Sequence, residues 1–305
     1  MKGESQAFMT VTRLTFKLDE GHNYIDLAMC MSSVLRTLVR QKQVFTVVGG
    51  QISDNSGGSV VLSTAPNFWY TKADINRCFR AWKTDRARAI ANAGLENSKS
   101  VAKFADFKVT LNTTSISTYK RPVYTAASSR TEIEAPDEWQ TSSVVNEDGV
   151  EKHFCIIGNH TGAYYSATKG WISTRPIPDG TIEPDMPDYA DAAGTGPADG
   201  TDDYKQDYLA LLHNTSDSQP EDLNLVLEDN NNSPFDHDSI FGPIDDSFNL
   251  QPQAFVQMST TVTNNMIAGF KALCGLIHIN VTGGTNPILI LDVMNTPSDR
   301  DWETN

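Results

Sequence analysis

Residues 44–65 read VFTVVGGQISDNSGGSVVLSTA, and this stretch decides the fold class of the chain. Two runs rich in valine and threonine, residues 44–50 and 59–65, flank the turn-rich segment 53–58. β-Branched residues favour strands, whereas glycine, asparagine and aspartate favour turns. The stretch therefore predicts two strands joined as a hairpin.

The same pattern recurs on both sides of this stretch. Short runs rich in β-branched and aromatic residues alternate with Gly, Pro, Asn and Asp turns, which is typical of a sandwich or a jelly roll. A parallel α/β sheet would need strands that alternate with helices throughout. We therefore predict a mainly β fold. The other predicted strands are 8–18, 107–118, 121–127, 153–159, 163–173, 254–263, 274–282 and 287–294.

Two segments with helical periodicity interrupt the strands. Residues 24–39 hold apolar side chains at roughly helical spacing, and residues 71–94 do so more clearly. Thr71 is the expected N-cap of the second helix. The residues expected on its apolar face are Ile75, Phe79, Trp82, Ala89, Ile90 and Ala93. The opposite face carries four basic residues, which are Arg77, Arg80, Lys83 and Arg88.

Charge is distributed unevenly along the chain. Residues 1–121 carry 17 Lys and Arg against 9 Asp and Glu, whereas residues 122–305 carry 7 against 29. The net charges are +8 and −22. This asymmetry indicates either a molecule with one face that meets a polyanion and one that repels it, or an acidic protein whose two halves intermix in space.

The stretch 178–249 differs from the rest of the chain. It is acidic, rich in Gly, Pro, Asp and Asn, and short of apolar runs. Structureless stretches of this length are uncommon inside a compact core. We therefore predict one β domain, formed by 1–177 with 250–305, and a long acidic surface insertion or protrusion at 178–249.

Catalytic signatures are missing from the sequence. It contains no Gly-x-Ser-x-Gly elbow, no Walker-type loop and no His-Glu-x-x-His motif. Carboxylates are too abundant for a catalytic pair to stand out, so a hydrolase on a β scaffold is the weakest of the hypotheses and we expect no enzyme. The four cysteines lie far apart, which predicts buried thiols rather than a zinc site.

Acidic residues near position 240 are weak candidates for Ca²⁺ ligands, because carboxylate oxygens are the ligands that Ca²⁺ prefers. They lack EF-hand spacing, so a solvated acidic loop is the alternative. No other cofactor is expected. The candidate ligands are Asp236, Asp238, Asp245 and Asp246.

The basic face of the 71–94 helix is the best candidate for function. Arginine and lysine side chains on one helix face can follow nucleic-acid phosphates in a salt-dependent way without reading sequence. The alternative is an ordinary solvated helix face. The strands show no interleaved aromatic residues of the kind that read RNA bases.

Several short islands of sequence occur in a recognisable order. They are Tyr24-Ile25-Asp26-Leu27, Leu38-Val39-Arg40-Gln41, Thr64-Ala65-Pro66-Asn67-Phe68-Trp69, Phe79-Arg80-Ala81-Trp82-Lys83, Ile156-Ile157-Gly158-Asn159-His160, Ser173-Thr174-Arg175-Pro176 and Cys274-Gly275-Leu276-Ile277. In this order they resemble the jelly-roll capsid proteins of environmental (metagenomic) small single-stranded DNA viruses. The resemblance runs along most of the chain.

The resemblance implies a viral jelly-roll β-sandwich that self-assembles into an icosahedral shell. A double jelly roll is the second choice for the fold. The implied partners are other copies of the chain, a single-stranded DNA genome bound without sequence specificity, and a host receptor. The implied location is the virion. Residues 1–12 contain Lys2 as their only base, so either genome contact would come from the folded basic half or the particle would package DNA by another route.

A β-sandwich carbohydrate-binding or adhesion module is the alternative. Its sugars would stack on aromatic side chains, although such side chains more often pack in cores. The N-terminus has no apolar core of a secretion signal, which counts against this alternative, and no apolar run is long enough for a membrane span. The aromatic candidates are Trp69, Tyr70, Tyr164, Tyr165 and Trp171.

Overall fold

The chain is divided between two compact units in the computed structural model. The first, here called the β unit, comprises Met1–Asn67, Phe104–Thr141 and Leu250–Asn305, and the second, the helix unit, comprises Phe68–Lys103 and Ser142–Asn249. The structure describes residues 10–41, 44–54, 57–94, 105–126, 129–133, 139–145, 150–158, 163–168, 250–259, 261, 264–284 and 286–295. The acidic insertion at 178–249 lies outside these ranges and stays a prediction.

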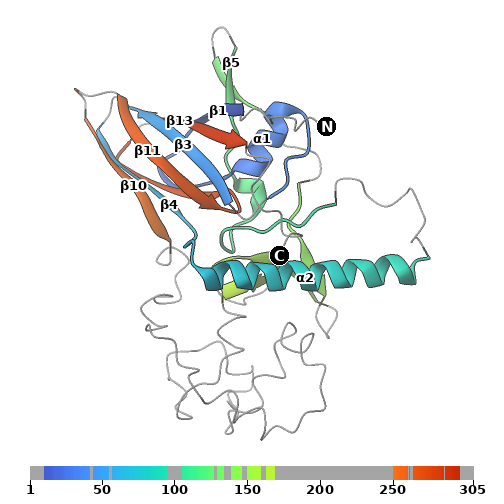
Figure 1. Ribbon diagram of the computed structural model, residues 1–305. Helices are drawn as coiled ribbons and strands as arrows, with labels where there is room; N and C mark the ends of the chain where they lie inside the picture. Colours follow the sequence, from blue (N-terminus) through green and yellow to red (C-terminus); the bar gives the residue numbers. More distant parts are fainter. Residues whose placement is uncertain are drawn as a thin grey trace, which may run out of the picture. The chain divides into compact units, whose positions relative to one another are not determined.

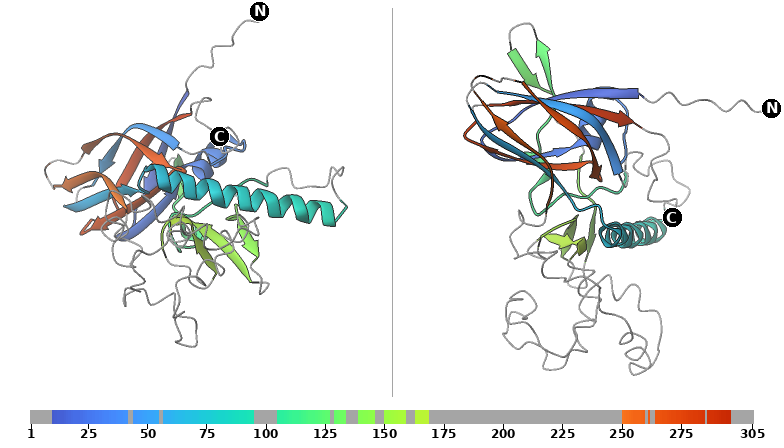
Figure 2. Two further views of the ribbon diagram at one scale, coloured as in Figure 1. Left: turned by 60° about the horizontal axis from the view of Figure 1, so that its bottom comes forward. Right: turned by 60° about the vertical axis from the view of Figure 1, so that its left-hand side comes forward.

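The β unit contains two four-stranded antiparallel sheets, which Figures 1 and 2 show as two layers. The β1 sheet has the order β1-β13-β3-β11, and the β2 sheet has the order β10-β4-β12-β2. Their strands are β1 (Thr10–Lys17), β2 (Gly21–Asp26), β3 (Val44–Ser53), β4 (Gly58–Thr64), β10 (Gln251–Met258), β11 (Asn264–Leu273), β12 (Leu276–Thr282) and β13 (Ile288–Asn295). The mainly β fold is confirmed.

Strand pairing in these sheets is nested. The first four strands pair in reverse order with the last four, as β1 with β13, β2 with β12, β3 with β11 and β4 with β10. Between successive strands of the eight, the chain changes sheet at every step except from β4 to β10. The eight strands thus form one long antiparallel ribbon that wraps around a common core.

Alternating side chains supply that core. In β1, Leu14 and Phe16 are buried between exposed or half-buried neighbours, and in β13 the buried positions are Leu289, Leu291 and Val293. Period-two alternation places these side chains on one face of the strand. Each fully buried large apolar side chain contributes about 1.5–3 kcal/mol. The apolar pattern therefore explains why these runs form strands.

The predicted hairpin within 44–65 is wrong. Both runs are strands, but β3 lies between β13 and β11, whereas β4 lies between β10 and β12. The turn between them, where Gly57 and Gly58 have φ angles of 77° and 120°, carries the chain from one sheet to the other. A local pattern identifies two strands and a turn, but it does not reveal whether the two strands pair with each other.

The predicted 24–39 helix is shorter than expected, since α1 spans Leu27–Leu35 and the preceding residues belong to β2. Asp26 begins the helix, because its carboxylate accepts hydrogen bonds from the backbone N–H groups of Ala28 and Met29. Arg36, with a left-handed φ of 55°, ends it. The two caps, rather than apolar periodicity, set the bounds of this helix.

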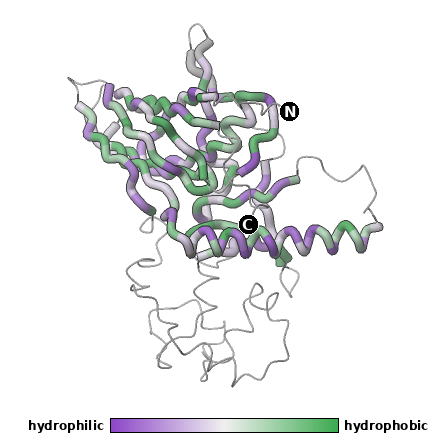
Figure 3. The backbone as a smooth tube through the Cα atoms, in the orientation of Figure 1, coloured by the Kyte–Doolittle hydropathy of each residue, from purple (hydrophilic) through white to green (hydrophobic). Residues whose placement is uncertain are grey.

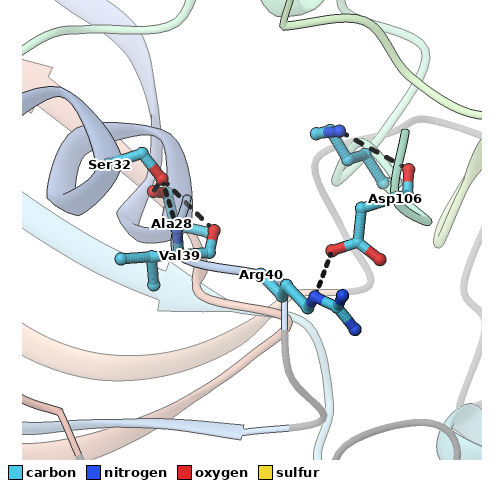
Figure 4. Close-up of polar contacts among 6 residues, drawn as sticks. Ala28, Ser32, Val39, Arg40 and Asp106 are labelled. Atoms are coloured by element: carbon cyan, nitrogen blue, oxygen red, sulfur yellow. Dashed lines mark hydrogen bonds and ion pairs between the residues drawn. The ribbon is translucent and has the colours of Figure 1, made fainter. Parts of the chain in front are cut away.

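Polar contacts hold the segment that follows α1, as Figure 4 shows. The Ser32 hydroxyl donates to the Ala28 carbonyl at 2.7 Å and accepts from the Val39 N–H at 2.8 Å. One residue later, the Arg40 guanidinium lies 3.8 Å from a carboxylate oxygen of Asp106. These contacts hold α1, the segment at residues 39–40 and Asp106 in place relative to one another.

The predicted strand at 107–118 is also wrong, because this segment is irregular and ends in the short 3-10 helix η1 (Ile116–Thr118). Gln41 bonds its backbone as a neighbouring strand would. The Gln41 amide oxygen accepts from the Val109 N–H at 2.8 Å, and its amide nitrogen donates to the Val109 carbonyl at 3.1 Å. Farther along, the Leu111 N–H donates to the Tyr119 hydroxyl.

Several smaller elements complete the described residues. β5 (Val123–Ala126) pairs with β6 (Ser129–Glu132) in the β unit, and the helix unit holds α2 (Trp69–Asn92), β7 (Ser143–Val145), β8 (Glu151–Cys155) and β9 (Tyr164–Ser166). The sequence prediction lacked strands β2, β6, β7 and β11. None of the helices among the described residues has the length and apolarity that crossing a membrane requires.

Candidate nucleic-acid interface

The long helix α2 begins earlier than the sequence predicts. Its N-cap is Phe68, which has extended backbone and makes no capping hydrogen bond through its side chain. The predicted cap, Thr71, is instead fully buried inside the first turn. Its hydroxyl thus points into the protein rather than toward the free N–H groups of the helix end, and the capping prediction is wrong.

One face of α2 is apolar and buried. Ile75, Cys78, Phe79 and Ala81 are less than a tenth exposed, and the helix contacts β7. A turn of 3.6 residues puts these four positions on one side of the helix. Of the predicted core face, Ile75 and Phe79 are thus confirmed as buried. The prediction is wrong for the C-terminal half of the helix, where Trp82 and Ile90 are half-buried and Ala89 and Ala93 are exposed.

The four predicted basic residues lie on the remaining, solvent-facing side. Arg80, Lys83 and Arg88 are exposed, and Arg77 is half-buried. Figure 3 shows hydrophilic segments recurring along the whole helix. The structure therefore presents these four side chains on one broad face, as a phosphate-binding helix requires.

The helix has a strong excess of positive charge. Six of its 24 residues are Lys or Arg, whereas its two acids are Asp74, which is buried, and Asp85. Asp85 lies 3.9 Å from the Arg88 guanidinium. An exposed pair of this kind contributes about 0–1 kcal/mol, so it leaves the excess charge of the face largely intact.

Aromatic rings lie beneath two of the cations. The Lys83 ammonium is 5.7 Å from the centre of the Phe79 ring, and the Arg86 guanidinium is 5.7 Å from the centre of the Trp82 ring. Contacts of this kind contribute roughly 0.5–1 kcal/mol at exposed sites. They restrict where the two long side chains lie and so arrange the charges along α2 in advance of binding.

The sequence analysis missed three further residues of α2 that bear on binding, which are Lys72, Arg86 and Trp69. Extending the helix to its true start would have found Trp69, which is 61% exposed. Lys72 and Arg86 are half-buried cations on the same helix. For Trp69 the missing signal was the N-terminal bound of the helix, because the predicted cap at Thr71 excluded the two residues before it, whereas Lys72 and Arg86 already lay within the predicted bounds.

A second polar cluster lies on the β2 sheet. His22 Nδ1 and His278 Nε2 are 2.9 Å apart, and the two rings stack with centroids 5.2 Å apart. The Tyr24 ring lies 5.1 Å from that of His278. Burial, followed by the nearby His22, lowers the pKa of His278 to about 4. Two imidazoles joined in this way form a structural hydrogen bond between neighbouring strands.

The described residues contain no recognisable metal site. No group of three or more His, Cys, Asp or Glu side chains among them is arranged to hold a metal ion. The Ca²⁺ candidates Asp236, Asp238, Asp245 and Asp246 lie outside the described residues. All four cysteines, Cys30, Cys78, Cys155 and Cys274, are buried free thiols, as the sequence predicts.

Of the aromatic side chains proposed for sugar stacking, the three that the structure describes differ in exposure. Trp69 is exposed, Tyr164 is half-buried and Tyr165 is buried. The side chain of Tyr70 and the whole of Trp171 lie outside the described part of the chain. Among the described candidates, Trp69 is thus the most exposed ring.

Comparison of the chain with protein-family models, curated proteins and solved structures gave no match. Two features of the molecule therefore bear on its function. One is the nested order of the eight strands in the β unit, and the other is the basic, solvent-facing side of α2 in the helix unit.

Proposed function

We propose that this protein is a viral major capsid protein that self-assembles into a closed icosahedral shell around its genome. The observation that carries the proposal is the strand order of the β unit. Two sheets of four strands, with the first four strands paired in reverse with the last four, are the connectivity expected of a jelly roll. Viral capsid subunits are a major class of jelly rolls.

A single jelly roll accounts better for the described strands than a double one. The eight strands of the β unit complete one set of two sheets. The helix unit contributes three short strands, β7 to β9, to the described residues. A second jelly roll would need eight strands of its own around a second core.

Exposed apolar side chains on edge strands support self-assembly. Phe255 on β10 is 67% exposed and Met266 on β11 is 80% exposed, and each strand is the edge of its sheet. An edge strand leaves N–H and C=O groups unpaired, and large apolar side chains on it favour contact with another chain. A shell subunit has to make several such contacts.

The basic side of α2 supports contact with nucleic acid. Charge reversal at three of its positions, Arg77→Glu, Arg80→Glu and Lys83→Glu together, should sharply reduce the nucleic acid retained by purified particles. The control reverses three exposed cations of the β unit, Lys17, Arg36 and Lys271. Equal retention by both variants and the parent, measured by the absorbance ratio at 260 and 280 nm, would remove α2 from the proposal.

Electron microscopy of the purified chain in negative stain, with light scattering for mass, is the deciding experiment. We expect uniform closed particles far heavier than the 33.5 kDa chain. Phe255→Asp with Met266→Asp should abolish particles while leaving the circular dichroism spectrum unchanged. Gln251→Asp, at an exposed polar position of β10, should leave the particles intact. A monomer at every salt concentration, pH and Ca²⁺ level would overturn the proposal.

The carbohydrate-binding alternative predicts the opposite result. Lectins also use jelly rolls, so the strand order alone does not separate the two functions. A lectin of this fold would remain monomeric or form small oligomers and would bind glycans on an array. Glycan binding that depends on Trp69, in a chain that forms no particles, would replace the capsid proposal with this alternative.

A further inference from the structure

Trp69 is the most exposed large aromatic residue among those described in the helix unit. At 61% exposure it presents most of its surface to solvent, and Phe68 beside it is 43% exposed. Burying a tryptophan would gain more free energy than burying almost any other side chain. The exposed indole and the neighbouring phenyl ring together give an apolar surface on which a ligand can stack.

The exposed indole lies in line with cations of α2. At about 100° per residue, Trp69, Asn76, Arg80 and Lys83 fall within about 60° of one another around the helix axis. Arg80 and Lys83 are exposed, and Asn76 is half-buried. The four positions form a straight stripe with an aromatic ring at its N-terminal end and two cations farther along.

The length of the stripe suits a short run of nucleotides. Fourteen residues separate Trp69 from Lys83, which corresponds to about 21 Å along the helix. Stacked nucleotides rise by about 3.4 Å each along one strand, so the stripe spans about six of them. One face of α2 therefore has room for both a stacked base and several phosphates.

We propose that this stripe binds single-stranded nucleic acid, with a base stacked on Trp69 and phosphates on Arg80 and Lys83, and that the indole makes α2 prefer single strands to duplex. This inference rests on the proposed contact between α2 and a genome. An aromatic platform joined to a row of cations is the common physical basis of single-strand binding without sequence preference. In a duplex the bases are stacked on one another, so a side chain reaches their faces only after unstacking them.

Fluorescence anisotropy of the full-length protein with labelled dT20 and with a 20-bp duplex tests the proposal. Trp69→Ala should weaken binding of dT20 by about 5- to 100-fold, because stacking on one aromatic residue contributes an effect of that size. Binding of the duplex should change by less than twofold. Trp69→Phe keeps an aromatic face and should restore most of the affinity for dT20, which separates stacking from misfolding.

The outcomes distinguish this inference from the proposed function. Equal binding of dT20 and duplex, unaffected by Trp69→Ala but weakened by Arg80→Glu with Lys83→Glu, would overturn the inference and leave the nucleic-acid contact in place. Failure of both probes to bind at low salt would overturn both. Loss of particles in Trp69→Ala with unchanged affinity for dT20 would assign Trp69 to a contact between subunits and overturn the inference.

Discussion

Asp26 is the residue on which most of the polar structure of the β unit depends. It is fully buried, and its carboxylate accepts four hydrogen bonds, from the backbone of Ala28 and Met29 and from the side chains of Gln41 and Trp139. Burial outweighs these bonds and raises the pKa of Asp26 to about 6. One side chain thus joins β2, α1 and two loops at the cost of desolvating a charge.

Replacing Asp26 with alanine should destabilise the fold by about 3–7 kcal/mol. The change removes an N-cap contribution of about 1 kcal/mol and leaves the Gln41 and Trp139 donors buried without an acceptor, at about 1–3 kcal/mol each. Asp26→Asn can keep the cap through one amide oxygen but puts an N–H donor where Gln41 and Trp139 need an acceptor, so its loss should be only about 1 kcal/mol smaller than that of Asp26→Ala. Urea unfolding followed by circular dichroism measures both values.

The control for this pair is Asp292→Asn. Asp292 forms an exposed salt bridge with Arg13, in which the oxygen–nitrogen distance is 2.7 Å. Exposed pairs contribute about 0–1 kcal/mol. Equal losses for Asp26→Ala and Asp292→Asn would contradict the role of Asp26 as the buried acceptor.

As the pH falls, the contribution of Asp26 to folding stability should rise and that of His278 should fall. Asp26 has a folded pKa of about 6 against an ordinary 3.8, so between pH 6 and 4 the folded state holds the extra proton and stability rises as pH falls. His278 has a folded pKa of about 4 against an ordinary 6.5, so the unfolded state holds the extra proton and stability falls over nearly the same range. Each shift of about two pH units corresponds to roughly 3 kcal/mol.

Between pH 6.5 and 4, the effects of these two residues on the stability of the parent chain should therefore nearly cancel. His278→Gln leaves the Asp26 contribution, so acid should stabilise this variant relative to the parent by about 1–3 kcal/mol. Asp26→Asn leaves the His278 contribution, so acid should destabilise it by a similar amount. Urea titrations at pH 6.5 and 4.5 measure the differences, and equal pH dependence in all three chains would contradict the assigned shifts.

At the scale of elements, the close approach of strands decides where glycine is required. In β3, a Cβ on Gly50 would lie 2.5 Å from the Ile290 carbonyl oxygen of β13. A Cβ on the adjacent Gly49 would lie 3.4 Å from the Ile267 carbonyl oxygen of β11. There is thus room for a Cβ atom at Gly49 but not at Gly50.

Gly50→Ala should destabilise the β unit by about 1–3 kcal/mol, because the clash is with backbone and the paired strands have to separate to relieve it. Gly49→Ala, at ordinary contact distance, should change stability by less than about 1 kcal/mol. Thermal unfolding of the two variants beside the parent measures the difference. A loss at Gly49 as large as that at Gly50 would show that the β3–β11 spacing at Gly49 is tighter than the one described.

At the scale of the whole molecule, the negative charge is concentrated in one segment. Residues 178–249 hold 18 of the 38 acidic residues and one of the 24 basic residues, so the rest of the chain has 23 basic against 20 acidic residues. Outside this segment the net charge is therefore +3, whereas that of the complete chain is −14. For a shell protein, such segregation favours nucleic acid on one side and repulsion between particles on the other.

Deleting 185–203 should leave particle assembly intact and make each subunit less acidic. The deleted segment holds six acidic residues and no basic residue. Particles should keep their diameter in electron micrographs and migrate more slowly toward the anode in native agarose gels. Replacing the same six aspartates with asparagine matches the charge change at full length, and loss of folding in the deletion alone would place 185–203 in the core.

Local pattern was enough to predict part of this protein. The β-rich composition, the amphipathic α2 with Arg80 and Lys83 on its solvent side, and the buried cysteines follow from periodicity and residue type, and the structure agrees with all three. These properties depend on residues close together in sequence, because a strand or helix shows its buried face in its own spacing. The segregation of charge is likewise visible in the sequence alone.

Only the tertiary structure decided how the elements combine. β1 pairs with β13 more than 270 residues away, β3 and β4 fall in different sheets, and the Gln41 side chain bonds residue 109 in place of a neighbouring strand. Strand partners are chosen by packing of the common core and by pairing of backbone groups across long loops. A run of alternating residues indicates that a strand will be half-buried, but the strand that completes its hydrogen bonds is determined only when the whole ribbon has wrapped around the core.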